Sequence, residues 1–394
     1  MTVHDRTRRR AVVVSTLGVT QTLAWGSTYY LPAVFADPIS AELGISHEWF
    51  FGVFSAALLV SGLLGPLAGR MIDRHGGRDI LAATSVVFAA GLVCLSMASG
   101  PAGLALGWAV IGVGMGFGLY EAAFATVTGL YGLEARNAIT GITLYAGFAS
   151  TVGWPASALF IESFGWRGAC LAWAALHVLV GLPLNRLLVP KANGPVVEES
   201  HHETPVNVSS AMAVLAFVFA AGWFVSTAMA AHLPRLLEAL GTSTAVAVGA
   251  GALIGPSQVA ARLVEFTLLR RVSPLVSARL ALGLHPVGAV LLALIGPPAA
   301  IVFVALHGAG NGLLTIARGT VPLALFGAAG YGLRTGILGA PARLLNGAAP
   351  LLFGLVLDRA GPVWALVLSG SLTGGAFLAL SLLRRPVRDR GKTV

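Results

Sequence analysis

The apolar segment 298–328 carries one stripe of polar side chains. His307, Asn311, Thr315 and Arg318 follow one another at intervals of four, four and three residues, so they share one face of a helix. Such a face needs a polar partner, because an unpaired polar group in apolar surroundings is costly. We therefore expect these side chains to contact a polar solute or a polar neighbouring helix.

Two further apolar segments each place an arginine and an amide on one helical face. Gln258 and Arg262 are four residues apart, and Arg343 and Asn346 are three apart. A guanidinium group binds carboxylate or phosphate oxygens in a planar fork, so these residues, with Arg318, favour an organic anion as the ligand. The alternative is structural, with each arginine hydrogen-bonding helix carbonyls between packed helices.

Carboxyl groups within the apolar segments are fewer than arginines. Glu121 lies well inside 102–131, where a carboxylate must be protonated, paired or facing water. Two roles stay open for it: a proton carrier, or a structural ion pair with an arginine. Glu265 lies near the end of its segment and can pair with Arg262. Three arginines against two glutamates leave at least one positive charge for an anionic ligand.

The first apolar segment adds an aromatic and amide face. Gln21, Trp25 and Tyr29 follow one another at intervals of four residues, so together they can pack against and hydrogen-bond a small planar solute. Aromatic side chains near a helix end also form interfacial belts in membranes, and Tyr29 fits that role equally well.

The composition indicates whether these residues lie in water or in a lipid bilayer. Hydrophobic residues make up 56% of the chain, charged residues only 10%, and the mean hydropathy is +0.83. A soluble domain carries about 25% charged residues, so we expect this chain to be a membrane protein. About 20 apolar residues cross the hydrocarbon core. Segments of this kind fall near 11–36, 47–70, 78–98, 102–131, 136–163, 165–188, 209–240, 243–268, 275–296, 298–328, 331–358 and 361–383.

The loop after the second segment resembles the signature loop of the major facilitator superfamily. That loop reads Gly, three residues, Asp, Arg or Lys, any residue, Gly, and two basic residues; here Gly69, Asp73, Arg74 and Arg78 fit, and Gly77 replaces the first of the two basic residues. The resemblance implies an all-α membrane protein with twelve transmembrane helices in two pseudo-symmetric six-helix bundles, with alternating access to a midplane site.

The resemblance also implies a gate. Gly69 permits close helix approach, and Asp73 is expected to meet the positive N-terminal end of the eleventh helix, which begins near Tyr331, and so to close the cytoplasmic side. Arg74 and Arg78 are either part of this gate or simple cytoplasmic anchors.

A second, partial resemblance is to the monocarboxylate and oxalate/formate branch of the superfamily. Arg262 matches that branch's substrate-binding Arg in the eighth helix, but Gln258 stands where the branch carries Asp, so proton coupling through that pair is in doubt. The fifth and sixth helices carry further matches: Tyr131, Arg136, Ala138, Gly141, Gly147, Gly153 and Gly165-Trp166-Arg167.

The chain is expected to divide into two halves. Residues 62–66 read Gly-Leu-Leu-Gly-Pro, and residues 252–256 repeat them as Ala-Leu-Ile-Gly-Pro, 190 positions later. The polar stretch 190–208 reads as a cytoplasmic linker between halves 1–189 and 209–394. His201 and His202 in it could bind a metal, but the lack of a third ligand at metal spacing favours a solvated linker.

The net charge of +9 follows the membrane topology and does not indicate nucleic acid binding. Nearly all loop Lys and Arg fall on the side of the N-terminus; only Arg167, Arg235 and Arg359 fall on the other. By the positive-inside rule, both termini lie in the cytoplasm, and the protein is a multi-pass protein of the cytoplasmic (inner) membrane.

The sequence thus predicts a secondary active transporter of a small, monocarboxylate-like organic anion, coupled to protons at Glu121 or driven by exchange. The alternative is proton-driven efflux of a drug or toxic compound. We expect a monomer in the lipid bilayer with no cofactor, no metal and no enzymatic activity, because His177, His285 and His307 form no catalytic motif. Cys94 and Cys170 are expected to stay free.

Overall fold

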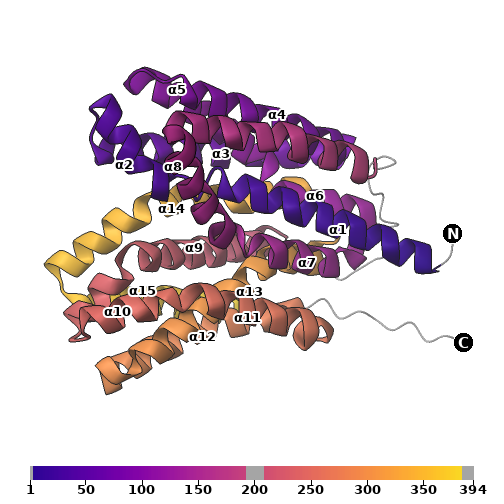
Figure 1. The fold of residues 1–394 in the computed structure, drawn as a ribbon. Helices are drawn as coiled ribbons and strands as arrows, with labels where there is room; N and C mark the ends of the chain where they lie inside the picture. The colour runs from indigo at the N-terminus through magenta and orange to yellow at the C-terminus, as the bar shows by residue number, and fades with distance from the viewer. Residues whose placement is uncertain (1–2, 192–207, 384–394) are drawn as a thin grey trace, which may run out of the picture. The chain divides into compact units, whose positions relative to one another are not determined.

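The computed structural model describes residues 3–191 and 208–383, almost all of them helical (Figure 1). Most of the predicted linker, including His201 and His202, lies outside these residues. Two compact units divide the chain: Met1–Pro195 with Gly330–Gly347, and Val196–Ala329 with Ala348–Val394. The division into halves 1–189 and 209–394, joined by the linker 190–208, stays a prediction.

The first unit contains the helices α1 (Val3–Gly26), α2 (Pro32–Leu43), α3 (His47–His75), α4 (Gly77–Ser96), α5 (Pro101–Gly118), α6 (Tyr120–Tyr131), α7 (Arg136–Ala146) and α8 (Ala149–Leu176). A short 3-10 turn, η1 (Gly132–Ala135), and two π-helical turns, η2 (His177–Gly181) and η3 (Leu184–Leu188), complete it with residues 331–347 of α14 (Tyr331–Arg359). The Gly165 backbone, at φ 67° and ψ 171°, kinks α8 between the predicted fifth and sixth spans.

Alternating glycines let α5 pack closely on two neighbours, α3 and α4, which lie beside it in Figure 1. A Cβ on Gly112 would stand 2.6 Å from the Ala57 carbonyl oxygen of α3, and one on Gly114 would stand 2.6 Å from the Phe88 ring of α4. Small residues permit such approach in a membrane, where van der Waals packing holds helices together. These glycines therefore position α5, and with it the start of α6.

The second unit contains α9 (Val208–Ala239), α10 (Thr244–Ala252), α11 (Ile254–Thr267), the 3-10 turns η4 (Leu269–Arg271) and η5 (Pro297–Ala299), α12 (Pro274–Ile295), α13 (Ala300–Phe326), residues 348–359 of α14, and α15 (Pro362–Leu382). Its core is built from fully buried apolar side chains such as Leu236, Phe303 and Phe353. The helices α12 and α13 form a hairpin around Gly296, whose φ of 79° suits a residue without a Cβ.

Within the described residues, nine helical stretches are long and apolar enough to cross a membrane. One of them, Pro101–Leu188, is 88 residues long and covers three of the predicted spans. The first predicted span corresponds to α1, which is not among the nine. The exact count of twelve spans therefore stays a prediction.

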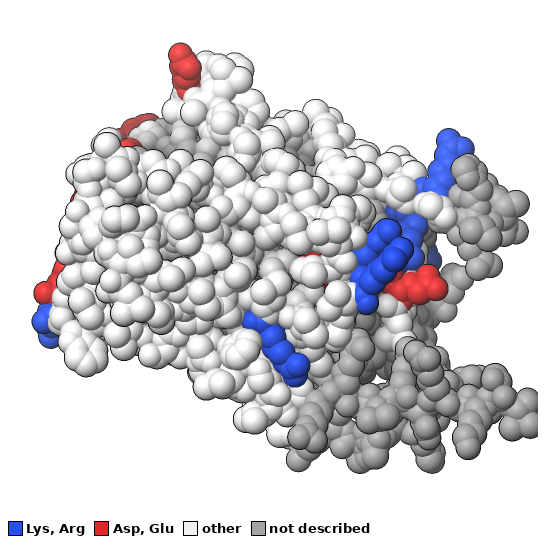
Figure 2. Space-filling view, turned by 90° about the horizontal axis from the view of Figure 1, so that it is seen from below, with Lys and Arg blue, Asp and Glu red and all other residues white. Residues whose placement is uncertain are grey.

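The surface is that of a membrane protein. Figure 2 shows one face on which charged side chains are sparse and uncharged residues cover most of the area. Leu63 is 70% exposed and Leu294 is 80% exposed, within α3 and α12 respectively. Apolar side chains in such positions face lipid without cost.

Candidate functional site

In the first unit, α3 and α14 cross with their backbones in contact. A Cβ on Gly69 would overlap the backbone carbonyl of Gly332, and one on Gly65 would stand 3.4 Å from the carbonyl oxygen of Gly336. Gly65 and Gly69 are one helical turn apart, as are Gly332 and Gly336, so four glycines line the crossing. The sequence reasoning identified Gly69 but not its partners on α14.

Asp73, in the last turn of α3, closes one end of this crossing. Its Oδ1 accepts a hydrogen bond from the Gly332 backbone N–H (2.8 Å) and its Oδ2 accepts one from the Leu333 N–H (2.9 Å). The first N–H groups of a helix have no partner within the helix, and the helix dipole adds positive potential there. The carboxylate therefore binds the N-terminus of α14 with both oxygens.

The two arginines of the signature loop do not take part in this contact. The Arg74 side chain is exposed, whereas Arg78 donates through Nε to Asp79 Oδ1 at 2.9 Å. Asp79 also lies 3.4 Å from Arg186 Nη1. The predicted gating role of Arg74 and Arg78 stays a prediction.

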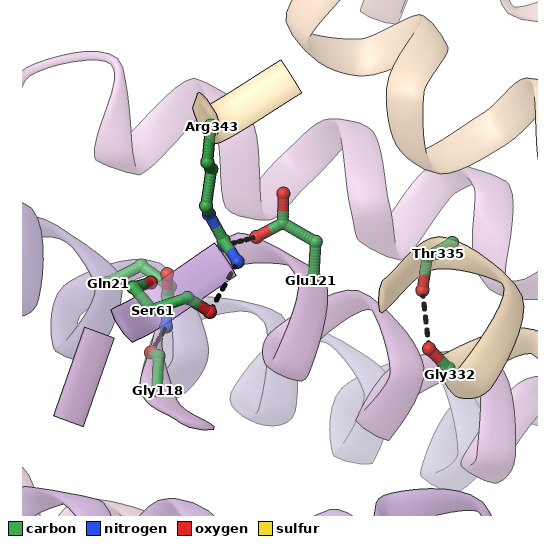
Figure 3. A network of polar contacts seen from close by, with 7 residues as sticks. All are labelled: Gln21, Ser61, Gly118, Glu121, Gly332, Thr335 and Arg343. Carbon is green, nitrogen blue, oxygen red and sulfur yellow. Dashed lines mark hydrogen bonds and ion pairs between the residues drawn. The ribbon is translucent and has the colours of Figure 1, made fainter. Parts of the chain in front are cut away.

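Further along the same crossing, a partly buried ion pair joins α14 to α6. Arg343 Nη2 donates to Glu121 Oε2 at 2.7 Å, and Arg343 Nη1 donates to the Ser61 carbonyl at 3.1 Å (Figure 3). The Arg343 and Glu121 side chains are only 11% and 18% exposed. Gly62 makes room for the arginine, since a Cβ there would stand 3.3 Å from the Arg343 Cβ.

A break between two helices positions Glu121. Leu119 is extended (φ −86°, ψ −168°), so α5 ends at Gly118 and α6 begins at Tyr120, with Glu121 in its first turn. The Gly118 carbonyl accepts a hydrogen bond from Gln21 Nε2 at 2.7 Å (Figure 3). The N-terminus of α6 adds a favourable potential for a negatively charged Glu121.

The Trp25 side chain at the end of α1 and the Tyr29 side chain in the turn after it lie beside this break. The Trp25 ring centroid lies 4.9 Å from that of Tyr120 and 5.2 Å from that of Tyr29. The Tyr29 hydroxyl lies 3.4 Å from Asn346 Nδ2. The structure thus brings together six of the predicted site residues, five from three helices and Tyr29 from the turn after α1: Gln21, Trp25, Tyr29, Glu121, Arg343 and Asn346. The expected single helical face of Gln21, Trp25 and Tyr29 is therefore wrong for Tyr29, because the helix ends at Gly26.

The remaining predicted residues belong to the second unit, where Arg262 is the most deeply buried cation of the three predicted. It is 5% exposed, and its Nη2 donates to Gln258 Oε1 of the same helix at 3.3 Å. Its Nε and Nη1 are buried and have no hydrogen-bond partner among the described residues. The side chain of Glu265, three residues on, is also buried.

A small cleft opens among α9, α12, α13 and α15. Its enclosed part has room for about one water molecule, and its lining includes Ser226, His285, His307, Asn311 and Thr373. His285 Nδ1 and His307 Nδ1 are 2.9 Å apart. Sequence reasoning did not place His285 in a site. A signal existed, because His285 and His307 each stand eleven residues from Gly296 at the hairpin turn.

Only part of the predicted stripe on α13 faces this cleft. His307 and Asn311 line it, whereas the Arg318 guanidinium lies over the Trp223 ring, 4.3 Å from its centroid. A cation over an indole face is attracted by the ring quadrupole. Trp223 was not among the predicted site residues.

Comparison with known proteins assigns the family. Residues 17–305 match the sequence model of the Major Facilitator Superfamily. The chain belongs to this superfamily. It is therefore a multi-pass membrane protein that transports small molecules, and superfamily members are transporters, not enzymes. The predicted family is confirmed.

Individual relatives are distant. An uncharacterized 38 kDa protein encoded in a 23S RNA operon of Thermoproteus tenax is 28% identical over 335 residues, covering 77% of this chain and 83% of that protein. An MFS-type efflux pump of Mycolicibacterium smegmatis is 27% identical, with 63% of this chain and 61% of the pump aligned. Monocarboxylate transporter 3 of Rattus norvegicus is 30% identical over 157 residues, 38% of this chain and 31% of the rat protein. The chain thus spans less than two thirds of the length of these last two relatives.

Solved structures confirm the major facilitator fold. The human organic anion transporter MFSD10 superposes with a TM-score of 0.72 at 16% identity, covering 94% of this chain and 99% of that one. The proton:xylose symporter XylE also gives a TM-score of 0.72, at 13% identity, covering 94% and 95% of the two chains.

Proposed function

We propose that this superfamily transporter carries a small organic anion, of the size of a monocarboxylate, across the cytoplasmic membrane by alternating access. The observation that supports an anion best is Arg262. Its guanidinium is buried, retains two nitrogen atoms without partners among the described residues, and is bonded to the neutral Gln258 amide. An anion that bound these nitrogens would satisfy donors whose burial is otherwise costly.

A second anion-binding group is Arg343, which the Glu121 carboxylate neutralises at 2.7 Å. Protonation of Glu121 would remove that negative charge and leave the guanidinium for a substrate carboxylate. A proton and a monovalent anion would then bind together, which is the requirement for proton-coupled anion transport. The ion pair alone, without proton binding, remains the structural alternative for Glu121.

The Asp73 contact would serve as the gate of this cycle. Two charge-assisted hydrogen bonds and a glycine-lined crossing stabilise the state in which α3 and α14 touch. Alternating access requires that this contact form in one state and break in another. The positive-inside distribution supports a cytoplasmic position for it, and both termini on the same side.

Counterflow in proteoliposomes tests the proposed function. Vesicles preloaded with one carboxylate should accelerate uptake of its labelled form, across a panel of formate, lactate, pyruvate and oxalate. Arg262→Lys keeps the charge but loses the planar fork, so it should weaken binding of the transported anion, and Arg262→Ala should weaken it further.

The matched control is Arg279→Lys. Arg279 lies in the same unit and donates to the Leu380 and Leu383 carbonyls, a helix-packing role, so this variant should transport as the parent does. Equal affinity of the parent and both Arg262 variants would assign Arg262 to packing. Absence of counterflow for every carboxylate would contradict the anion assignment.

Proton-driven efflux of a drug or toxic compound is the second candidate, favoured by the similarity to the mycobacterial efflux pump. It predicts stimulated transport of uncharged or cationic compounds in inside-out vesicles, with little effect of Arg262→Ala. Carboxylate counterflow and drug transport therefore distinguish the two functions.

A further inference from the structure

We propose that the His285–His307 pair of this transporter binds a single proton, and that the transported anion compensates the resulting positive charge. Compensation by the anion rests on the proposed anion transport, whereas proton binding by the pair can be tested separately. The pair is separate from Glu121, which lies in the other compact unit.

The geometry of the pair defines its neutral state. The two Nδ1 atoms are 2.9 Å apart, so one ring carries a proton on Nδ1 and donates it, and the other ring accepts with its Nδ1 lone pair. The accepting ring then carries its own proton on Nε2. The donating ring keeps a free lone pair on its Nε2, which is the one basic position of the pair that can bind a proton without loss of the hydrogen bond.

Proton uptake at that Nε2 makes the donating ring an imidazolium and turns the Nδ1–H···Nδ1 contact into a charge-assisted hydrogen bond. A second proton would have to enter the accepting Nδ1, where two N–H groups would face each other. The pair is thus built to bind one proton and not two. The buried His285 Nε2, which has no partner among the described residues, is one of the two candidate positions.

Among the described residues, no carboxylate lines the cleft beside the new charge. The packed elements carry charged groups on α11 and α12 (Arg262, Glu265, Arg279), on α13 and α9 (Arg318, His232, Arg235, Glu238) and on the second-unit part of α14 (Asp358, which pairs with Arg235, and Arg359), while α10 and α15 carry no charged or titratable residue. None of these side chains lines the cleft beside the two histidines. Both rings are at most 4% exposed, so an uncompensated imidazolium there would be costly.

In a conformation of the transport cycle that widens this cleft, an anion in it would compensate that charge. The hydroxyls of Ser226 and Thr373 and the Asn311 amide line the same cleft and can hydrogen-bond a carboxylate. Binding of the anion therefore favours binding of the proton, and by thermodynamic reciprocity the proton favours the anion to the same extent. The cleft would then bind proton and anion together, although no carboxyl side chain is present in its lining.

Nitrogen NMR of ¹⁵N-histidine-labelled protein tests proton binding without any transport measurement. Signals of His285 and His307 should change together as a single-proton titration between about pH 5 and 8 in the presence of saturating pyruvate. His285→Asn keeps a donor for His307 Nδ1 but cannot titrate, so it should abolish the joint titration. Two neutral rings throughout this range would overturn the proposal, as would two independent titrations.

Proton uptake on binding tests the link to the anion. In weakly buffered detergent solution, pyruvate binding to the His285→Asn variant should take up about one proton fewer than binding to the parent. The matched control is His177→Asn, a buried histidine of the other unit bonded to Ser27 Oγ at 2.7 Å, which should take up as many protons as the parent.

Equal proton uptake by the His285→Asn variant and the parent would overturn the proposed coupling between proton binding by the pair and anion binding. A parent that binds and exchanges no carboxylate would instead refute the proposed anion transport. The NMR titration is then repeated without pyruvate and extended to lower pH, because burial without an anion disfavours the imidazolium; a joint one-proton titration still supports proton binding by the pair, and two independent titrations overturn it. Size-exclusion profiles of His285→Asn and of a second variant, His307→Gln, check that lost uptake does not reflect misfolding.

Discussion

The Arg343 guanidinium and the Glu121 carboxylate form a 2.7 Å ion pair between helices whose residues are 222 positions apart in the chain. The pair contains the first unit's most buried predicted cation and its predicted proton carrier. Because a charge buried without its partner is costly, the protonation of Glu121 and the ligation of Arg343 must influence each other.

Replacement of Glu121 by Gln should uncouple transport from the proton gradient. The amide resembles the protonated carboxyl group, still offers an acceptor to Arg343, and cannot release a proton. We expect the part of the accumulation that Glu121 couples to an imposed pH gradient to be lost, while binding and exchange between equal pools persist; if the His285–His307 pair binds no proton, the accumulation should disappear altogether. Glu42→Gln is the control, because Glu42 pairs with Arg167 at a partly exposed position. Parent-like accumulation by Glu121→Gln would make the ion pair structural.

Replacement of Asp73 by Asn should weaken the contact with α14. One of the two carboxylate oxygens becomes an NH₂ group facing an N–H donor, and the negative charge at the helix N-terminus is lost. A hydrogen bond to a charged group contributes about 1.5–3 kcal/mol, so transport should fall sharply while folding survives. Cysteine accessibility near Leu333 should rise. The control Asp79→Asn removes an exposed carboxylate and should transport normally; unchanged transport by both variants would remove the gating role of Asp73.

Replacement of Gly69 by Ala should disturb the same crossing by steric overlap. The new methyl group would overlap the Gly332 carbonyl, and overpacking of this kind costs about 1–3 kcal/mol. That energy shifts a two-state equilibrium about 5- to 150-fold, so α3 and α14 should separate more often. Gly52→Ala in the same helix is the matched control, since no atom lies within 4 Å of the added Cβ. Equal transport rates in the two variants would show that the close approach is not needed.

The predicted topology places both termini in the cytoplasm. Impermeant thiol reagents should label single cysteines at Val394 and Glu199 only from the cytoplasmic side, and both positions lie outside the described residues. Labelling of either from the opposite side would exclude the twelve-span arrangement, because an even number of spans returns the chain to its starting side.

The sequence by itself determined the membrane class and the family. Long apolar segments must be helical in lipid, because only a helix satisfies its backbone groups within one segment. The loop from Gly69 to Arg78 identified the superfamily and predicted that Asp73 meets a helix N-terminus near Tyr331. The membrane class depends on composition alone, whereas the contact of Asp73 with this helix is what the resemblance to the superfamily implies.

Only the tertiary structure decided which charged groups meet. Helical periodicity places Arg343 on a polar face but does not say whether Glu121, 222 residues away, reaches it. That contact depends on the glycine-lined approach of α3 and α14 and on the break at Leu119 that positions the start of α6. Likewise, His285 and His307 meet because α12 and α13 pack as a hairpin. Arg318 lies over the Trp223 ring, a contact that helical periodicity does not predict because a position on a helical face does not say which neighbouring side chain packs against it.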